Sequence, residues 1–87
     1  MEIYESKRKD KRYMAIIQGK KYHFGLKTGN TYIDHKNKKK RENYIKRHIV
    51  NEDWSKVNAG SLSRLLLWGH STSLDKNIND YIKRFNL

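Results

Sequence analysis

The stretch Arg12-Tyr13-Met14-Ala15-Ile16-Ile17-Gln18, followed by Gly19-Lys20 and then by Lys21-Tyr22-His23-Phe24, decides the fold of this chain. Both flanking segments are rich in β-branched and aromatic residues, which are typical of strands. A glycine in the first of two turn positions favours a type II′ hairpin. That turn would pair Ile17 with Tyr22 and Ala15 with Phe24. The sequence therefore predicts an antiparallel hairpin.

The hairpin has one face suited to a core. Side chains alternate across a strand, so one face collects five apolar or aromatic residues: Tyr13, Ala15, Ile17, Tyr22 and Phe24. Met14, Ile16 and His23 belong to the opposite face. Glu2 to Glu5, joined to the hairpin by the polar segment Lys7 to Lys11, predicts a third strand at the edge. Residues 1–25 are thus expected to form a sheet of two or three strands.

A strongly basic helix is predicted over residues 32–50. Residues 36–47 carry seven cationic side chains and one carboxylate. The apolar residues Tyr44, Ile45 and Ile49 lie near the end of this helix, and only Ile33 lies near its start. The amino-terminal half is therefore expected to project away from the core and to contribute little to packing.

Two shorter helices are predicted to close the core. Residues 58–68 favour a buried helix that is capped by Asn58 and stopped by Gly69. Residues 73–86 favour a final helix, with Thr72 and Asp75 as a capping box. The expected core consists of Leu66, Leu67, Trp68, Ile78, Tyr81, Phe85, Ile17 and Phe24, and Trp54 is also expected to pack inward. The fold class is therefore α+β, with an antiparallel sheet followed by three helices in one small domain spanning residues 1–87.

Composition limits the classes of protein that the chain fits. Apolar residues make up 36% of the sequence, which is below the roughly 45–50% of ordinary globular domains, so a small core is expected. Cysteine is absent, which excludes disulfides and cysteine-based zinc sites. No apolar run approaches the ~20 residues of a membrane-spanning helix, and no signal-peptide core follows Met1. The expected location is the cytosol, the nucleus or the interior of a virion, neither secreted nor membrane-bound.

The net charge of +11 is unevenly distributed and indicates a polyanionic partner. Residues 1–57 hold 16 cationic and seven acidic side chains, whereas residues 58–87 hold four and two. Cations at helical spacing repel one another, and binding to a polyanion relieves that repulsion. Binding to nucleic acid is also favoured because it releases the counterions condensed on the phosphates.

Several short motifs, taken in order, resemble those of a known family. They are His23-Phe24-Gly25, Tyr32 with His35-Lys36, Arg47-His48, Asn51-Glu52-Asp53-Trp54, Ala59-Gly60, Leu62-Ser63-Arg64, Leu67-Trp68, Ser71-Thr72-Ser73-Leu74, Ile78, Asp80-Tyr81 and Lys83-Arg84-Phe85. This series, over roughly residues 12–87, resembles a family of small, basic, uncharacterised proteins encoded by giant nucleocytoplasmic large DNA viruses. The resemblance implies a viral provenance and favours viral DNA handling or virion packaging. It implies no mechanism.

No catalytic constellation is found. Asp34-His35, Asn43 and His48 superficially resemble the elements of a His-Asn-His nuclease, but on one continuous helix His35 and His48 would lie about 20 Å apart. The serines lack a His/Asp partner pattern, and the glycines have no phosphate-loop spacing. The sequence therefore predicts no enzyme, no metal and no cofactor.

The sequence favours non-enzymatic, largely sequence-independent binding of nucleic acid, with duplex DNA preferred over RNA. Lysine acts as a point charge and offers little base readout, so low specificity is expected. The candidate phosphate contacts are Lys7, Arg8, Lys9, Lys11, Lys36, Lys38, Lys39, Lys40, Arg41, Lys46 and Arg47. The alternative is a structural class: a small cement or scaffold protein of a virion whose basic face binds an acidic protein.

Overall fold

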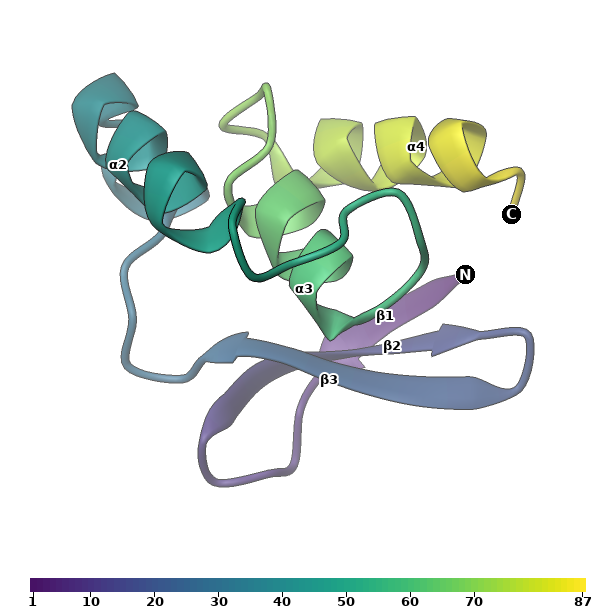
Figure 1. The fold of residues 1–87 in the computed structure, drawn as a ribbon. Helices are drawn as coiled ribbons and strands as arrows, with labels where there is room; N and C mark the ends of the chain where they lie inside the picture. Colours follow the sequence, from purple (N-terminus) through teal and green to yellow (C-terminus); the bar gives the residue numbers. More distant parts are fainter.

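A three-stranded antiparallel sheet carries all the helices on one of its faces in the computed structural model, which describes residues 1–87 (Figure 1). The strands are β1 (Glu2–Glu5), β2 (Lys11–Ile17) and β3 (Lys20–Leu26), in the order β1-β2-β3. The helices are α1 (Tyr32–His35), α2 (Lys38–His48), α3 (Ala59–Leu62) and α4 (Leu74–Phe85), and a π-helical turn, η1 (Ser63–Leu67), follows α3. The α+β class and the third strand at the edge are confirmed.

The predicted turn of the hairpin is wrong by one residue. Gln18 and Gly19 occupy the two turn positions, at φ 50° and 80°, so that Ile17 pairs with Lys20 and Ala15 with Tyr22. Two successive residues with positive φ are typical of a type I′ turn, whose twist suits a hairpin. The expected pairs Ile17–Tyr22 and Ala15–Phe24 are therefore wrong.

The predicted faces of the hairpin are nevertheless confirmed. Moving the turn by one position shifts every cross-strand partner by two residues, which leaves each side chain on its original face. Ala15, Ile17 and Phe24 are buried, and Tyr13 and Tyr22 pack beside them. On the other face, Met14 lies opposite His23, and the His23 Nδ1 is 2.7 Å from the Ser6 Oγ.

The continuous helix predicted over residues 32–50 is also wrong. Lys36 adopts the left-handed conformation at φ 58° and ends α1, and Asn37 then caps α2 by accepting hydrogen bonds from the amides of Lys39 and Lys40. The 3.6-residue periodicity cannot reveal a single left-handed residue. α2 ends at His48, and Ile49 and Val50 beyond it are 55% and 76% exposed. Ile49 therefore does not anchor the helix as expected.

α1 is fixed to the sheet by a bidentate ion pair. The Arg12 Nη1 and Nη2 atoms donate to the two Asp34 carboxylate oxygens at 2.7 and 2.8 Å. Asp34 Oδ2 also accepts from the Thr31 amide at 2.8 Å, which completes the cap of α1. These bonds, that from Arg12 foremost, hold the pKa of Asp34 well below its usual range.

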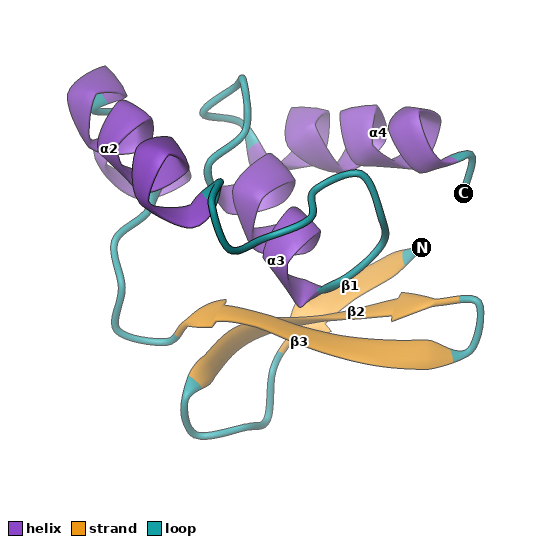
Figure 2. Ribbon diagram, viewed as in Figure 1, coloured by secondary structure: helices purple, strands orange, loops and turns teal.

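The core lies between the sheet and the segment from Leu62 to Trp68. α3 and η1 pack on β3, and α4 packs on η1 (Figure 2). Of the predicted core, Leu66, Leu67, Trp68, Tyr81, Ile17 and Phe24 are buried, whereas Ile78, Phe85 and the additional residue Trp54 are only partly buried.

The two C-terminal helices form close to their predicted positions. The expected helix over residues 58–68 begins at Ala59 after the Asn58 cap, and becomes π-helical where the Trp68 amide donates to the Ser63 carbonyl at 3.2 Å. α4 is capped by Ser73, so the capping box assigned to Thr72 is wrong. Gly69 is required between them, since a Cβ there would lie 2.3 Å from the Leu65 carbonyl oxygen.

The buried stack around Trp68 predicts a large effect of its removal. Trp68→Ala is expected to lower the free energy of unfolding by about 3–5 kcal/mol, because a buried aromatic leaves a cavity in a small core. Chemical denaturation of both proteins measures this change. A variant that unfolds at the parental midpoint would show that Trp68 is not a core residue.

The Arg12–Asp34 pair predicts acid sensitivity. A carboxyl with a lowered folded-state pKa stabilises the fold above its unfolded pKa of about 4, and this stability is lost as the pH falls through that value toward the folded pKa. Asp34→Asn should therefore be less stable than the parent at pH 7, and the difference should shrink between about pH 4 and pH 2. Thermal melts across this range measure it, with the exposed Asp75→Asn as the control. A pH-independent difference would contradict the assignment.

Candidate nucleic-acid interface

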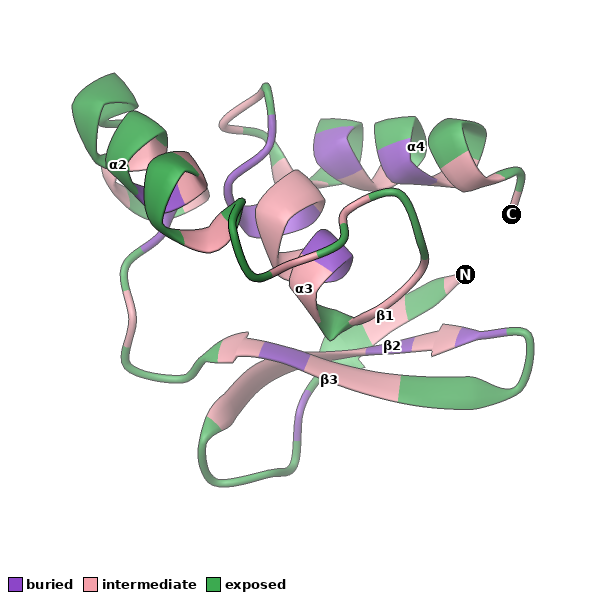
Figure 3. Cartoon of the chain, viewed as in Figure 1, coloured by how far each residue is buried: buried purple, intermediate pink, exposed green.

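The predicted phosphate contacts are largely exposed. Lys7, Arg8, Lys9, Lys36, Lys38, Lys39, Lys40, Lys46 and Arg47 are exposed, whereas Lys11 and Arg41 are half-buried. The first turns of α2 are exposed almost all round (Figure 3), as expected for a helix whose apolar residues come late.

Very little of the positive charge is neutralised within the chain. Of the 20 lysines and arginines, only Arg12 and Lys56 lie within 4.0 Å of a carboxylate, at Asp34 and Asp53 respectively. None of the eleven candidate residues forms an ion pair. Their charge is therefore available to an external anion.

The structure does not gather these residues into one patch. The loop between β1 and β2, which carries Lys7, Arg8 and Lys9, and the amino-terminal end of α2 lie at opposite ends of the molecule (Figure 1). Lys38, Lys39 and Lys40 follow one another in the first turn of α2 and form the densest cluster. Lys11, by contrast, lies on β2 and borders a groove across from Arg47 and His48 of α2.

Arg41 has a packing role that sequence reasoning missed. Its Nε donates to the Gly69 carbonyl at 2.8 Å and to the Trp68 carbonyl at 3.2 Å, and its guanidinium lies over the ring of Tyr32. The expectation that Arg41 contributes little to packing is therefore wrong. No local pattern links it to Gly69, which lies 28 positions along the chain.

Arg64 is a second arginine that binds the Trp68 carbonyl. Its Nη1 donates to the Trp68 carbonyl at 2.7 Å, while its Nε is buried without a partner. Burial, and then the charge of Arg41, lower the pKa of Arg64. Arg41 and Arg64 thus share the Trp68 carbonyl oxygen, and neither forms an ion pair with a carboxylate. The partial negative charge of the carbonyl offsets their positive charge only in part.

Three stacked rings connect α2 to the core. Tyr44 and Trp68 lie 4.3 Å apart between ring centroids and are nearly parallel, at 7°; His48 stacks on Tyr44 at 4.1 Å. The Tyr44 hydroxyl donates to the Ser63 Oγ at 3.1 Å, and burial raises the pKa of Tyr44. His48 is the end of this column, because its ring pairs with no other aromatic. We call these three residues the aromatic column.

Glu52 holds the far end of the column in place. Its Oε2 lies 2.6 Å from the His48 Nδ1, and its Oε1 accepts from the Trp54 Nε1 at 2.8 Å. Both oxygens of this carboxylate are therefore engaged within the protein. Trp54, which the sequence placed in the core, instead lies half-exposed beside Arg64.

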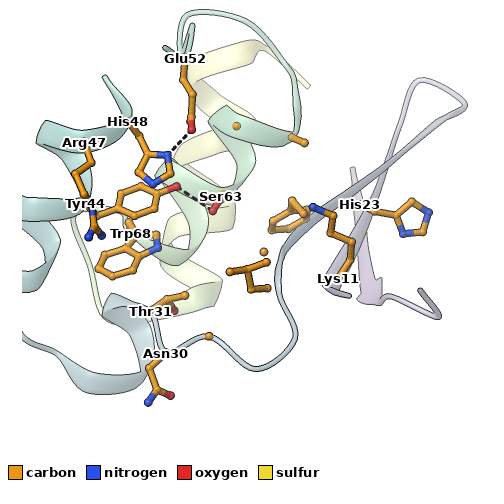
Figure 4. Close-up of a pocket in the computed structure, with 16 residues that line it drawn as sticks. Lys11, His23, Asn30, Thr31, Tyr44, Arg47, His48, Glu52, Ser63 and Trp68 are labelled. Atoms are coloured by element: carbon orange, nitrogen blue, oxygen red, sulfur yellow. Dashed lines mark hydrogen bonds and ion pairs between the residues drawn. The ribbon is translucent and has the colours of Figure 1, made fainter. Parts of the chain in front are cut away.

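A groove of about 450 Å³ lies between β3 and the carboxyl-terminal part of α2 (Figure 4). The aromatic column and Ser63 form one wall, and Phe24, Gly25 and Leu26 form the other. Lys11 and Arg47 lie on opposite sides of the groove in this view, and Asn30 and Thr31 lie along its lower edge. His23 also borders it, but its ring points away. Sequence reasoning missed this groove because its residues come from five separate segments.

The histidines do not form a metal centre. No group of three or more histidine, cysteine, aspartate or glutamate side chains is placed to hold a metal ion. The break at Lys36 and Asn37 puts His35 and His48 on different helices, so the premise of one continuous helix was wrong. Asp34 pairs with Arg12 and His48 with Glu52. No helix is both long enough and apolar enough to cross a membrane.

The two roles of the basic helix predict different effects of mutations. Arg41→Gln should lower the free energy of unfolding by about 1–3 kcal/mol, because the Gly69 carbonyl loses its charged donor and the Trp68 carbonyl keeps only Arg64. Lys39→Gln, two residues away on the exposed side, should change it by less than about 0.5 kcal/mol. Denaturant titrations of the two variants measure this contrast. If the two variants have the same free energy of unfolding, Arg41 has no packing role.

Comparison with known proteins identifies a family without identifying an activity. A family model matches residues 1–48, which comprise the sheet, α1 and α2, and so span the basic helix. No curated protein and no solved structure matches the chain significantly. The expectation of a family without an assigned activity is confirmed. The chain belongs to the family of unknown function DUF5754.

Proposed function

We propose that this protein is a non-enzymatic, largely sequence-independent nucleic-acid-binding protein that prefers duplex DNA. The observation that carries the proposal is the uncompensated charge of α2: Lys38, Lys39 and Lys40 are exposed in its first turn and pair with no carboxylate. Cations in the first turn oppose the positive end of the helix dipole, and a line of phosphates offsets this unfavourable charge.

The geometry of α2 supports contact along its exposed side. The helix is docked through Tyr44 and Arg41, and its first turn projects beyond the core (Figure 3). Lysine contacts to phosphates fix a protein on DNA but carry little sequence information. Between Lys36 and Asn43, the groups able to reach base edges are Asn37, Arg41 and Asn43, and two are constrained: Asn37 caps α2 and Arg41 binds carbonyls. Low sequence specificity follows.

The biological setting that we propose is viral genome handling or packaging, inside a virion or in the host cytoplasm or nucleus. It rests on the resemblance to basic proteins of giant DNA viruses. A basic cement or scaffold protein that binds an acidic protein is the competing reading of the same surface. Competition distinguishes them, because an acidic protein should displace DNA poorly if the lysines prefer phosphate.

Charge removal on α2 tests the proposal. If five to seven cations meet phosphates, log Kd should change with log salt at a slope of magnitude about 5 to 6. Changing Lys38, Lys39 and Lys40 together to Gln should weaken binding and reduce that magnitude by up to about three, with the free energy of unfolding unchanged or slightly raised. Fluorescence anisotropy with a labelled duplex at several salt concentrations measures both quantities.

The matched control removes exposed lysines elsewhere. Lys76 and Lys83 lie on α4, in the weakly charged part of the chain, and their change to Gln should alter binding little. If the triple variant binds DNA normally and the Lys76/Lys83 variant loses binding, the interface lies on α4 instead. A salt slope near zero would refute phosphate contact altogether.

A further inference from the structure

We propose that the groove beside the aromatic column binds an unpaired nucleotide, so that the protein recognises the junction between a duplex and a single strand. This inference rests on the proposed function and adds a second contact to it. The groove shares Lys11 and Arg47 with the candidate phosphate contacts, but its α2 residues lie at the opposite end of that helix from the lysine cluster.

The size of the groove suits a nucleotide and excludes a duplex. A volume of about 450 Å³ is within the usual range for small-ligand sites, roughly 300–1,000 Å³. A double helix does not fit into such a hollow, because its major groove alone is about 12 Å wide. A single extruded or overhanging nucleotide can enter where a base pair cannot.

The charges around the groove match a phosphodiester chain. Lys11 and Arg47 flank it on opposite sides, and neither has a carboxylate partner (Figure 4). The one acidic residue on its wall, Glu52, has both oxygens occupied by His48 and Trp54. Two cations thus flank the groove against one carboxylate, whose oxygens are both engaged within the protein. Backbone phosphates on either side of a bound nucleotide are the complementary charges.

The aromatic column offers one surface for a base. Tyr44 is covered on its two faces by Trp68 and His48, whereas His48 pairs only with Tyr44. The His48 side chain is 39% exposed, so it can be reached from solvent. A base stacked on His48 would extend the column by one ring, and stacking on histidine is a common mode of single-strand recognition. Asn30, Thr31 and Ser63 add polar groups to the edge of the groove.

The spacing connects the groove to the lysine cluster. Lys38 and His48 are ten residues apart on one helix, which is about 15 Å along its axis. Duplex DNA advances 3.4 Å per nucleotide, so this distance corresponds to roughly four nucleotide steps. A duplex held by the lysines can therefore place a short overhang at the groove.

The experiment compares a duplex bearing a four-nucleotide overhang with a blunt duplex of equal phosphate number. The parental protein should bind the overhang duplex at least about fivefold more tightly, the effect expected for one stacked base. His48→Ala should abolish this preference and leave blunt-duplex affinity unchanged. His48→Phe, which retains a ring and loses the Glu52 bond, should restore it.

A second variant closes the groove without changing charge. Ala59 is exposed at the start of α3 and borders the groove, so Ala59→Trp should also abolish the overhang preference, with Ala59→Ser as the matched control. Equal binding of both duplexes by the parent would overturn the groove proposal alone, and absence of binding to either would overturn the proposed function as well. A polyglutamate peptide serves as a competitor without bases. If it displaces the overhang duplex as readily as the blunt duplex, the protein is attracted by charge only and the groove proposal is overturned.

Discussion

The stack of Tyr44 on Trp68, reinforced by the bonds from Arg41 to the Trp68 and Gly69 carbonyls, determines how the basic helix is held. α2 has few apolar residues, and Ile49, which could have served as a second anchor, is exposed. In a chain with only 36% apolar residues, two aromatic rings and one guanidinium replace the broad apolar stripe that usually fixes a surface helix. The position of the cationic face relative to the sheet follows from these contacts, together with the partly buried Ile45 and the Tyr44–Ser63 hydrogen bond.

This arrangement separates the residues that stabilise α2 from those that carry its charge. Lys38, Lys39 and Lys40 are exposed and add no packing, and as cations in the first turn they oppose the positive end of the helix dipole. Arg41 belongs to both sets, because its Nε is committed to carbonyl groups while its charge adds to the local potential together with that of Arg64.

The sequence predicted those features that depend on repeated local patterns. Alternation identified the buried face of the hairpin with Ala15, Ile17 and Phe24, and the aliphatic run ending in Trp68 identified the centre of the core. The sequence did not predict backbone conformations that involve one or a few residues. These are the left-handed Lys36, the positive φ of Gln18 and the π-helical turn at Ser63, which depend on tertiary context. The groove escaped it for a different reason, since Lys11, Asn30, His48 and Ser63 meet only after the sheet and helices have packed.

The placement of the groove also limits the kind of ligand that can bind the groove and the lysine cluster together. The lysine cluster and the groove lie at the two ends of α2, about 15 Å apart along its axis. A small anion can occupy one of them but cannot span both. A stiff polymer with regularly spaced charges gains from both at once, because the second contact is made at high effective concentration after the first. Nucleic acid also carries flat bases at regular spacing, and on the groove proposal one of these would stack on the exposed end of the aromatic column at His48.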